Sequence, residues 1–200
     1  MTRTQHGGPT SVRTREELAG LTGRGVRPKY LFFWGHQPQR DGSIGAGCLS
    51  QWWPSGFTVD GVEYRSAEHW MMAGKARLFG DDAALARIQE ARHPNAAKKL
   101  GRQVRGFDEE EWIRHRWDLV VEGNVAKFGQ DAAMREYLLG TGARVLVEAS
   151  PLDRIWGIGL AADDERAPDP AQWRGLNLLG FALMEARMRL LRPARERLRA

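Results

Sequence analysis

The order of strand-like and helix-like patterns constrains the fold of this chain most. An apolar, aromatic run at residues 30–34 predicts a buried strand, and two β-like runs within residues 57–64, joined by Asp-Gly, predict a hairpin. Helical patterns then follow one another up to a strand-like run at 144–148 and a last helical stretch at about 176–191. Because strands and helices do not alternate, we expect no βαβ repeat. The prediction is an α+β fold in a single compact domain, with a small mixed β-sheet and a hairpin surrounded by mostly helical segments.

Five further helices are predicted between the hairpin and the strand at 144–148. Each is predicted from the residues at its start. Ser and Asp side chains accept hydrogen bonds from the first turn of a helix, and proline fits that turn. The expected helices run over about 67–79 after Ser66, from Asp81 to about 92, from Pro94 to about 104, from Asp108 to about 128 and from Asp131 to about 140.

The net charge of +5 comes from the two ends of the chain. Residues 1–29 carry a charge of +4 and residues 186–200 a charge of +5, whereas residues 30–185 carry −4. A nucleic-acid-binding domain is expected to carry its basic face on the folded part. We therefore favour solvated basic ends over ends that touch nucleic acid.

A length of 200 residues suits one folded domain with distinct ends. We expect residues 1–28 to form a largely disordered tail with one short helix, which begins after Thr14 and ends near Leu21. Residues 29–192 are the expected domain, and residues 193–200 an arginine-rich C-terminal tail.

The sequence gives no sign of a disulfide, a metal site or a membrane span. Cys48 is the only cysteine, and the five histidines show no metal-ligand spacing. We therefore expect no metal and no cofactor. The chain has no apolar run of about 18 residues and no apolar N-terminal stretch, so we expect a cytoplasmic protein without a membrane partner. The pattern leaves the oligomeric state open.

Residues 66–75 form the strongest local feature. In a helix, Glu68, Met72 and Lys75 fall on one face. A carboxylate in an aromatic, water-poor cleft is a common catalytic acid or base. A solvated face or a structural ion pair explains the same pattern equally well.

Two later stretches also carry candidate residues. Residues 153–159 follow the strand at 144–148, where loops often carry function, and Trp156 there either stacks on a flat ring or anchors the loop to the core. Asn177, at a helix start, is either a helix cap or a ligand-binding residue. The glycine-rich residues 35–56 either shape a pocket or act as a lid.

A series of short stretches, in one order over about residues 30–190, matches a known family. They are Phe57-Thr58-Val59-Asp60-Gly61, Ala67-Glu68-His69 through Lys75, Lys99-Leu100-Gly101-Arg102, Trp112, Ala126-Lys127-Phe128, Leu138-Leu139-Gly140-Thr141, Leu146-Val147-Glu148, Asp153 with Trp156-Gly157-Ile158-Gly159, and Gly175-Leu176-Asn177-Leu178-Leu179-Gly180 through Leu183-Met184. Through them the chain resembles the NADAR family, which includes YbiA-type N-glycosidases. It departs from that family's pattern at Ser50-Gln51-Trp52, Met72 and Gly74.

The resemblance implies cleavage of an N-glycosidic bond, without a cofactor. Breaking a ribose C1–N bond builds positive charge at C1, and Glu68 is expected to stabilise it and to orient or deprotonate water. Asp153 is the second expected catalytic residue, as a polar partner of the leaving base. The expected substrate contacts are stacking by Trp156, phosphate binding by Lys75, Arg102 and the amides of Gly157 and Gly159, and ribose binding by Asn177.

The resemblance leaves three functions open. We favour a small nucleotide-like substrate, an early riboflavin intermediate of the pyrimidine ribosylamine phosphate class, because the middle of the chain is acidic. The second function is removal of ADP-ribose from guanine in modified DNA or RNA, which the basic ends fit. The third is a non-catalytic module that binds ADP-ribose or NAD, and the carboxylate at Glu68 argues against it.

Overall fold

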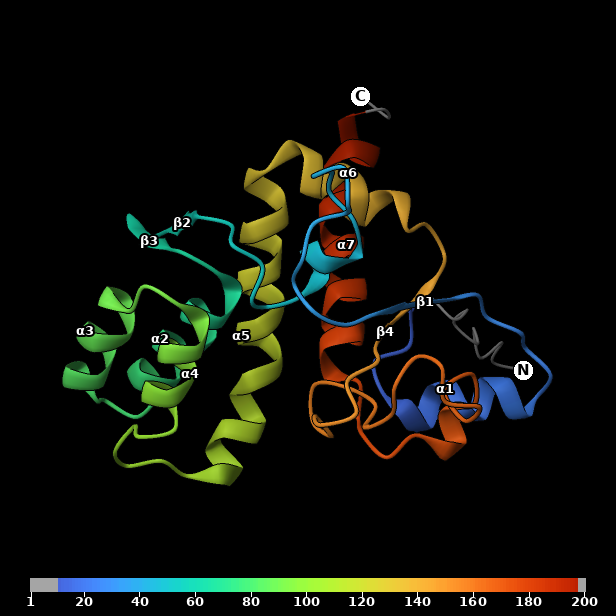
Figure 1. Ribbon diagram of the computed structural model, residues 1–200, viewed down its shortest axis with the longest axis horizontal. Helices are drawn as coiled ribbons and strands as arrows, with labels where there is room; N and C mark the ends of the chain where they lie inside the picture. The colour runs from blue at the N-terminus through green and yellow to red at the C-terminus, as the bar shows by residue number, and fades with distance from the viewer. Residues whose placement is uncertain (1–10, 198–200) are drawn as a thin grey trace. The chain divides into compact units, whose positions relative to one another are not determined.

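The computed structural model describes residues 11–197, with side chains up to residue 192. These residues form two compact units (Figure 1). The first unit comprises the chain up to Trp34 together with the chain from Leu138 onward, and the second comprises Gly35–Tyr137. The second unit is therefore an insertion in the sequence of the first. Helix α6 (Ala132–Gly140) contains the boundary between them.

The first unit is built around a parallel pair of strands. Strand β1 (Tyr30–Phe33) pairs with β4 (Val145–Glu148), with Tyr30 opposite Val145 and Phe33 opposite Glu148. Strand β4 packs against helix α7 (Leu178–Arg197), and its first three residues are completely buried. A parallel pair needs a long crossover, and here the crossover contains the whole second unit.

The segment before β1 belongs to this unit. Thr14 caps helix α1 (Arg15–Gly23), which lies against the short 3-10 helix η3 (Pro170–Gln172), and Leu18 is completely buried. The predicted short helix after Thr14 is present, and it places residues 11–28 in this unit instead of a largely disordered tail, because Leu18 and Leu21 are buried. Residues 1–10 lie outside the described residues.

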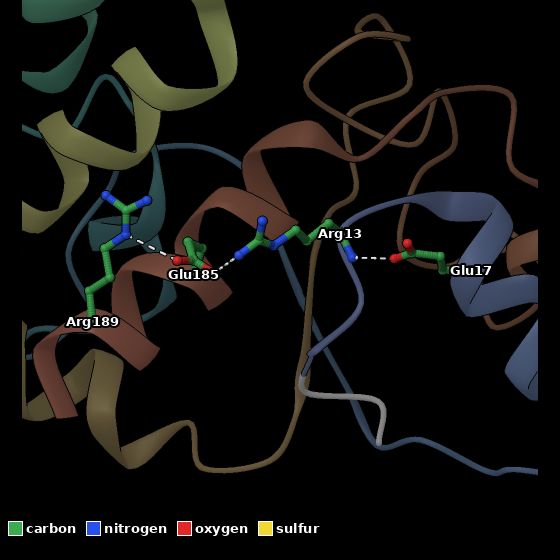
Figure 2. Close-up of polar contacts among 4 residues, drawn as sticks. All are labelled: Arg13, Glu17, Glu185 and Arg189. Atoms are coloured by element: carbon green, nitrogen blue, oxygen red, sulfur yellow. Dashed lines mark hydrogen bonds and ion pairs between the residues drawn. The ribbon is translucent and has the colours of Figure 1, made fainter. Parts of the chain in front are cut away.

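An ion-pair network connects this segment to α7 (Figure 2). Arg13 Nη2 donates to Glu185 Oε2 over 3.0 Å, and Arg189 Nε donates to Glu185 Oε1 over 3.0 Å. The backbone N–H of Arg13 also donates to the Glu17 carboxylate, 2.7 Å away. At the other end of the chain, α7 continues to Arg197, past the expected domain end at 192; residues 198–200 lie outside the described residues.

The second unit is a helical cluster with a hairpin. Strands β2 (Phe57–Val59) and β3 (Val62–Tyr64) are antiparallel, and Asp60 and Gly61 both have positive φ, as the two-residue turn requires. Every residue of α2 from Ala67 to Gly74 is buried. Helix α2 (Ala67–Leu78) packs against α3 (Asp82–Glu90), α4 (Pro94–Gly101) and α5 (Glu109–Gln130) (Figure 1).

Two glycines let the neighbouring helices approach α2. A Cβ at Gly123 of α5 would overlap the Trp70 ring, and a Cβ at Gly101 of α4 would overlap the Met72 side chain. Trp70 Nε1 donates to the Leu119 carbonyl over 2.7 Å, so the indole is fixed in this interface. The position of α2 therefore depends on glycine at both contacts.

The α+β class and the predicted helices and strands are confirmed, and the arrangement of the strands differs in one respect. The strands form two separate two-stranded sheets instead of one mixed sheet, because β1 pairs with β4 whereas the hairpin strands pair with each other. Residues 35–56 contain the 3-10 helix η2 (Ala46–Leu49). Over the described part of the chain, no helix combines the length and apolar character that a membrane crossing needs.

Candidate functional site

Glu68 occupies the first turn of α2 and is 2% exposed. Its N–H donates to the Gln51 carbonyl, 2.9 Å away, which ties the helix start to the loop after η2. The N-terminus of a helix favours a negative charge. The second unit thus holds a buried carboxylate at a fixed position, which excludes a solvated face for Glu68.

Ser66 and His69 brace the same turn. Ser66 Oγ lies 2.7 Å from His69 Nδ1, and His69 Nε2 lies 3.0 Å from the Ala91 carbonyl oxygen. A carbonyl only accepts, so Nε2 carries the proton and Nδ1 accepts from the serine hydroxyl. Burial lowers the pKa of His69, which keeps the ring neutral. Both side chains are buried, so the pair stabilises the start of α2.

Lys127 supports the loop that accepts a hydrogen bond from the Glu68 N–H. The sequence pattern did not identify it as a candidate site residue. It is 1% exposed, and its Nζ donates to the carbonyls of Cys48 and Ser50 over 2.6 and 2.8 Å. Burial lowers the pKa of Lys127 to about 7. The sequence signal was a lysine between the apolar residues Ala126 and Phe128 in a long helix. These contacts run from Lys127 through residues 48–51 to the Glu68 amide.

The Cys48 thiol fits a structural role. It is completely buried, and burial raises its pKa to about 11. A thiol with a raised pKa is a poor nucleophile. This agrees with the absence of an evident base near Cys48 in the sequence.

Lys75 lies two turns after Glu68 on α2, next to aromatic rings. Its Nζ is 3.9 Å from the ring centroid of Phe107 and 5.8 Å from that of Trp112. Burial lowers the pKa of this half-buried lysine. A rise of 1.5 Å per residue separates the Cα atoms of Glu68 and Lys75 by about 10 Å along the helix. The Lys75 ammonium group therefore lies over the Phe107 ring, on the same helix as the Glu68 carboxylate.

Arg102 lies at the end of α4, directly after Gly101, which contacts Met72 of α2. Its side chain is exposed, and its N–H donates to the Lys98 carbonyl over 3.2 Å. The structure thus puts Glu68 and Lys75 on one helix and Arg102 at the end of a helix packed against it. All three belong to the second unit.

The loop at residues 153–159 belongs to the first unit and is held largely by its own polar groups. Asp153 Oδ1 accepts from the N–H groups of Ile155 and Trp156, over 2.9 and 2.8 Å. The backbone carbonyl of the half-buried Trp156 accepts a hydrogen bond from the Leu179 N–H. This bond ties the loop to the start of α7. One oxygen of the Asp153 carboxylate is therefore used inside the loop.

The two glycines of this loop have packing roles. The Gly159 N–H donates to the Asp153 carbonyl over 3.1 Å, and Gly159 has a φ of 67°. The expectation that this amide binds phosphate is corrected, because the amide closes the loop. A Cβ at the buried Gly157 would lie 2.9 Å from the Glu148 carbonyl oxygen, so close packing accounts for glycine there.

Asn177 has a structural role that replaces the expected contact to ribose. It is completely buried, with a φ of 55°. Its Oδ1 accepts from the Glu148 N–H over 2.9 Å, and its Nδ2 donates to the Leu146 carbonyl over 3.0 Å. The amide pairs with the backbone of β4 as a neighbouring strand would. Both ends of the side chain are therefore engaged inside the first unit.

The candidate residues fall into two sets by unit. Glu68, Lys75 and Arg102 lie in the second unit; Asp153, Trp156, Gly157, Gly159 and Asn177 lie in the first. Between residues 11 and 192, the structure has no group of three or more His, Cys, Asp or Glu side chains that could hold a metal ion.

Curated relatives share the reaction class that the residues suggest. N-glycosidase R617 of Acanthamoeba polyphaga mimivirus is 43% identical over 164 residues, which are 80% of this chain and 95% of the relative. N-glycosidase YbiA of Escherichia coli strain K12 is 32% identical over 143 residues, which are 69% of this chain and 76% of the relative. The expected class, an enzyme that hydrolyses N-glycosyl bonds, is confirmed by these relatives.

The fold has a solved counterpart. The NMR structure of the E. coli protein YbiA superposes with a TM-score of 0.65 and 24% identity, covering 86% of this chain and 90% of that chain. The family model of the NADAR domain matches residues 32–191. The chain belongs to the NADAR family.

Proposed function

We propose that this chain hydrolyses the ribose C1–N bond of a phosphorylated N-ribosyl compound, with a pyrimidine ribosylamine phosphate as its substrate. The observation that carries the proposal is the buried Glu68 carboxylate, fixed in the first turn of α2 by the Gln51 carbonyl and by the Ser66–His69 pair. The names of the curated relatives support the same bond class.

Glu68 acts on the sugar in this proposal. As the C1–N bond breaks, its electron pair goes to the leaving nitrogen and positive charge develops at C1. A fixed carboxylate beside C1 stabilises that charge, and it accepts a proton from the water that attacks C1. The hydroxyl of that water ends on C1, and its proton is passed on to the leaving amine.

The other candidate residues of the second unit bind the substrate. Lys75 pairs with the phosphate, and Arg102 adds a second cation from the end of α4. Stacking by Trp156 and the polar contact of Asp153 to a base, both in the first unit, stay predictions from the resemblance.

The substrate class is tested by product analysis. Purified protein is incubated separately with the pyrimidine ribosylamine phosphate and with ADP-ribosylated guanine DNA, and the products are read by mass spectrometry. Release of ribose 5-phosphate from the first substrate supports the proposal. Release of ADP-ribose from the DNA alone supports the second function, and binding of ADP-ribose without turnover of either substrate supports a binding module.

The basic ends favour the second candidate, a glycohydrolase for ADP-ribosylated guanine. Residues 1–29 and 186–200 carry charges of +4 and +5. Contacts between these ends and DNA phosphates release counterions, so activity on modified DNA should fall steeply as salt rises. Activity on the small substrate should change little over the same range.

A further inference from the structure

A cavity of about 530 Å³ lies in the first unit, where its two parallel strands begin. Lys29 immediately precedes β1 and Arg144 immediately precedes β4, and both line the cavity with Arg27 and Thr141. The loop at residues 153–159 follows the opposite end of β4. A four-residue strand separates the two ends by about 13 Å. The cavity is therefore distinct from the candidate loop of the same unit.

Three cationic side chains line this cavity without a carboxylate partner among the described residues. Arg144 donates from Nε to the Thr141 carbonyl and from Nη2 to the Gly140 carbonyl, over 2.9 Å each. Arg27 Nη1 lies 3.3 Å from the Thr22 carbonyl oxygen. These partners are neutral, so they orient the side chains and leave their positive charge uncompensated.

A fourth cation lies behind the cavity wall. Arg187 of α7 is 1% exposed, and its Nη1 donates to Thr141 Oγ1 over 2.7 Å and to the Arg144 carbonyl over 3.1 Å. Its Nη2 is buried and has no hydrogen-bond partner among the described residues. Burying a charge is unfavourable unless an opposite charge or a full set of hydrogen bonds compensates it. An anion in the adjacent cavity would supply that charge.

We propose that this cavity binds a small molecule that carries a diphosphate group. Guanidinium and ammonium groups bind phosphate oxygens with charge-assisted hydrogen bonds, and Arg27, Lys29 and Arg144 line the cavity with such groups. The volume suits a small ligand, and Pro28 and Ala143 give an apolar wall for its organic part. The site is separate from Glu68 and does not depend on the proposed reaction.

Inorganic pyrophosphate is the probe, applied to the full chain at constant ionic strength. Calorimetric titration should show binding, and the melting temperature should rise with pyrophosphate concentration as expected for a ligand of the folded state. In the double variant Lys29→Gln, Arg144→Gln the dissociation constant should rise at least about tenfold, the effect of losing charge-assisted hydrogen bonds. The readout is the ligand-dependent change, so a lower melting temperature of the free variant does not affect it.

Two control variants test whether cationic side chains outside the cavity contribute to pyrophosphate binding. Arg24→Gln removes an exposed arginine of the same unit that does not line the cavity, and it should leave the dissociation constant within about twofold of wild type. Lys75→Gln should also bind pyrophosphate as wild type does. No binding by the wild type, unchanged binding by the double variant, or loss of binding in Lys75→Gln would each overturn the proposal.

Discussion

At the scale of single residues, the surroundings of Glu68 are set by groups distant in the sequence. Lys127 holds the carbonyls of Cys48 and Ser50, and the neighbouring Gln51 carbonyl accepts from the Glu68 N–H. This buried lysine is costly to remove, because the buried Cys48 carbonyl is left without its donor and the Ser50 carbonyl keeps only the Trp53 N–H. Lys127 is therefore a positioning residue for the carboxylate.

Replacement of Lys127 by methionine tests this role. Lys127→Met should lower the free energy of unfolding by about 1–3 kcal/mol and reduce kcat more than it changes KM, because the loop under Glu68 loses its anchor. Urea unfolding and steady-state kinetics measure the two effects. Lys99→Met, at an exposed position of α4, is the control and should behave as wild type. Equal stability of both variants would contradict the role.

His69 predicts a pH dependence of stability. Burial lowers its pKa in the folded protein below the value of about 6.5 in the unfolded chain. The unfolded chain therefore binds a proton more readily, and the stability that the neutral ring contributes is lost as the pH falls below about 6.5. Urea unfolding should show a flatter pH dependence for His69→Gln than for wild type over about pH 5–7. A slope in His69→Gln identical to that of the wild type would refute the assignment.

The sequence predicted some residue roles and missed others for a physical reason. The carboxylate at Glu68 was visible as one of two charges, with Lys75, on a helix face that also carries Met72. Asn177 and Gly159 were misassigned, because their partners are backbone groups of β4 and Asp153, which only the folded loop brings close. A side chain whose partner is distant backbone leaves no local pattern in the sequence.

At the scale of elements, helix starts were predicted well because their caps are local. Ser66, Asp81 and Asp108 each accept a hydrogen bond from the first turn of the helix that they begin. Strand pairing was less predictable, since β1 and β4 are more than 100 residues apart in the sequence. Helix packing depends on close contacts such as that between Gly123 and Trp70, which no periodicity reveals.

Substitution of Gly123 tests the packing of α2 on α5. Gly123→Ala should lower the free energy of unfolding by about 1–3 kcal/mol, and the melting temperature with it, because the new methyl group overlaps the Trp70 ring. Gly23→Ala is the matched control: its Cβ meets nothing within 4 Å, and it should be neutral or slightly stabilising. A Gly123→Ala protein as stable as the control would show that the helices do not approach this closely.

At the scale of the whole molecule, the first unit is assembled from both ends of the chain. Residues 11–34 supply α1 and β1, and the chain from Leu138 onward supplies β4 and α7. The sequence predicted a largely disordered tail up to residue 28, with one short helix that ends near Leu21. Leu18 and Leu21 are one helical turn apart and both are buried, which makes the segment part of the unit.

Truncation of Leu18 tests whether this segment is structural. Leu18→Ala should lower the free energy of unfolding by about 2–5 kcal/mol, as for a completely buried leucine. Glu16→Ala, at an exposed position of the same helix, should change it by less than about 0.5 kcal/mol. Both are measured by urea unfolding, and a leucine variant as stable as its control would make residues 11–28 a tail after all.

We propose that this N-glycosidase works through the buried carboxylate of Glu68. The most direct test is the kcat of Glu68→Gln on the pyrimidine ribosylamine phosphate, with Glu122→Gln at an exposed position of α5 as the control. We expect kcat to fall by about 10²–10⁴ in Glu68→Gln, while its melting temperature and the kcat of the control stay near wild type. Near-wild-type turnover by a folded Glu68→Gln protein would contradict it.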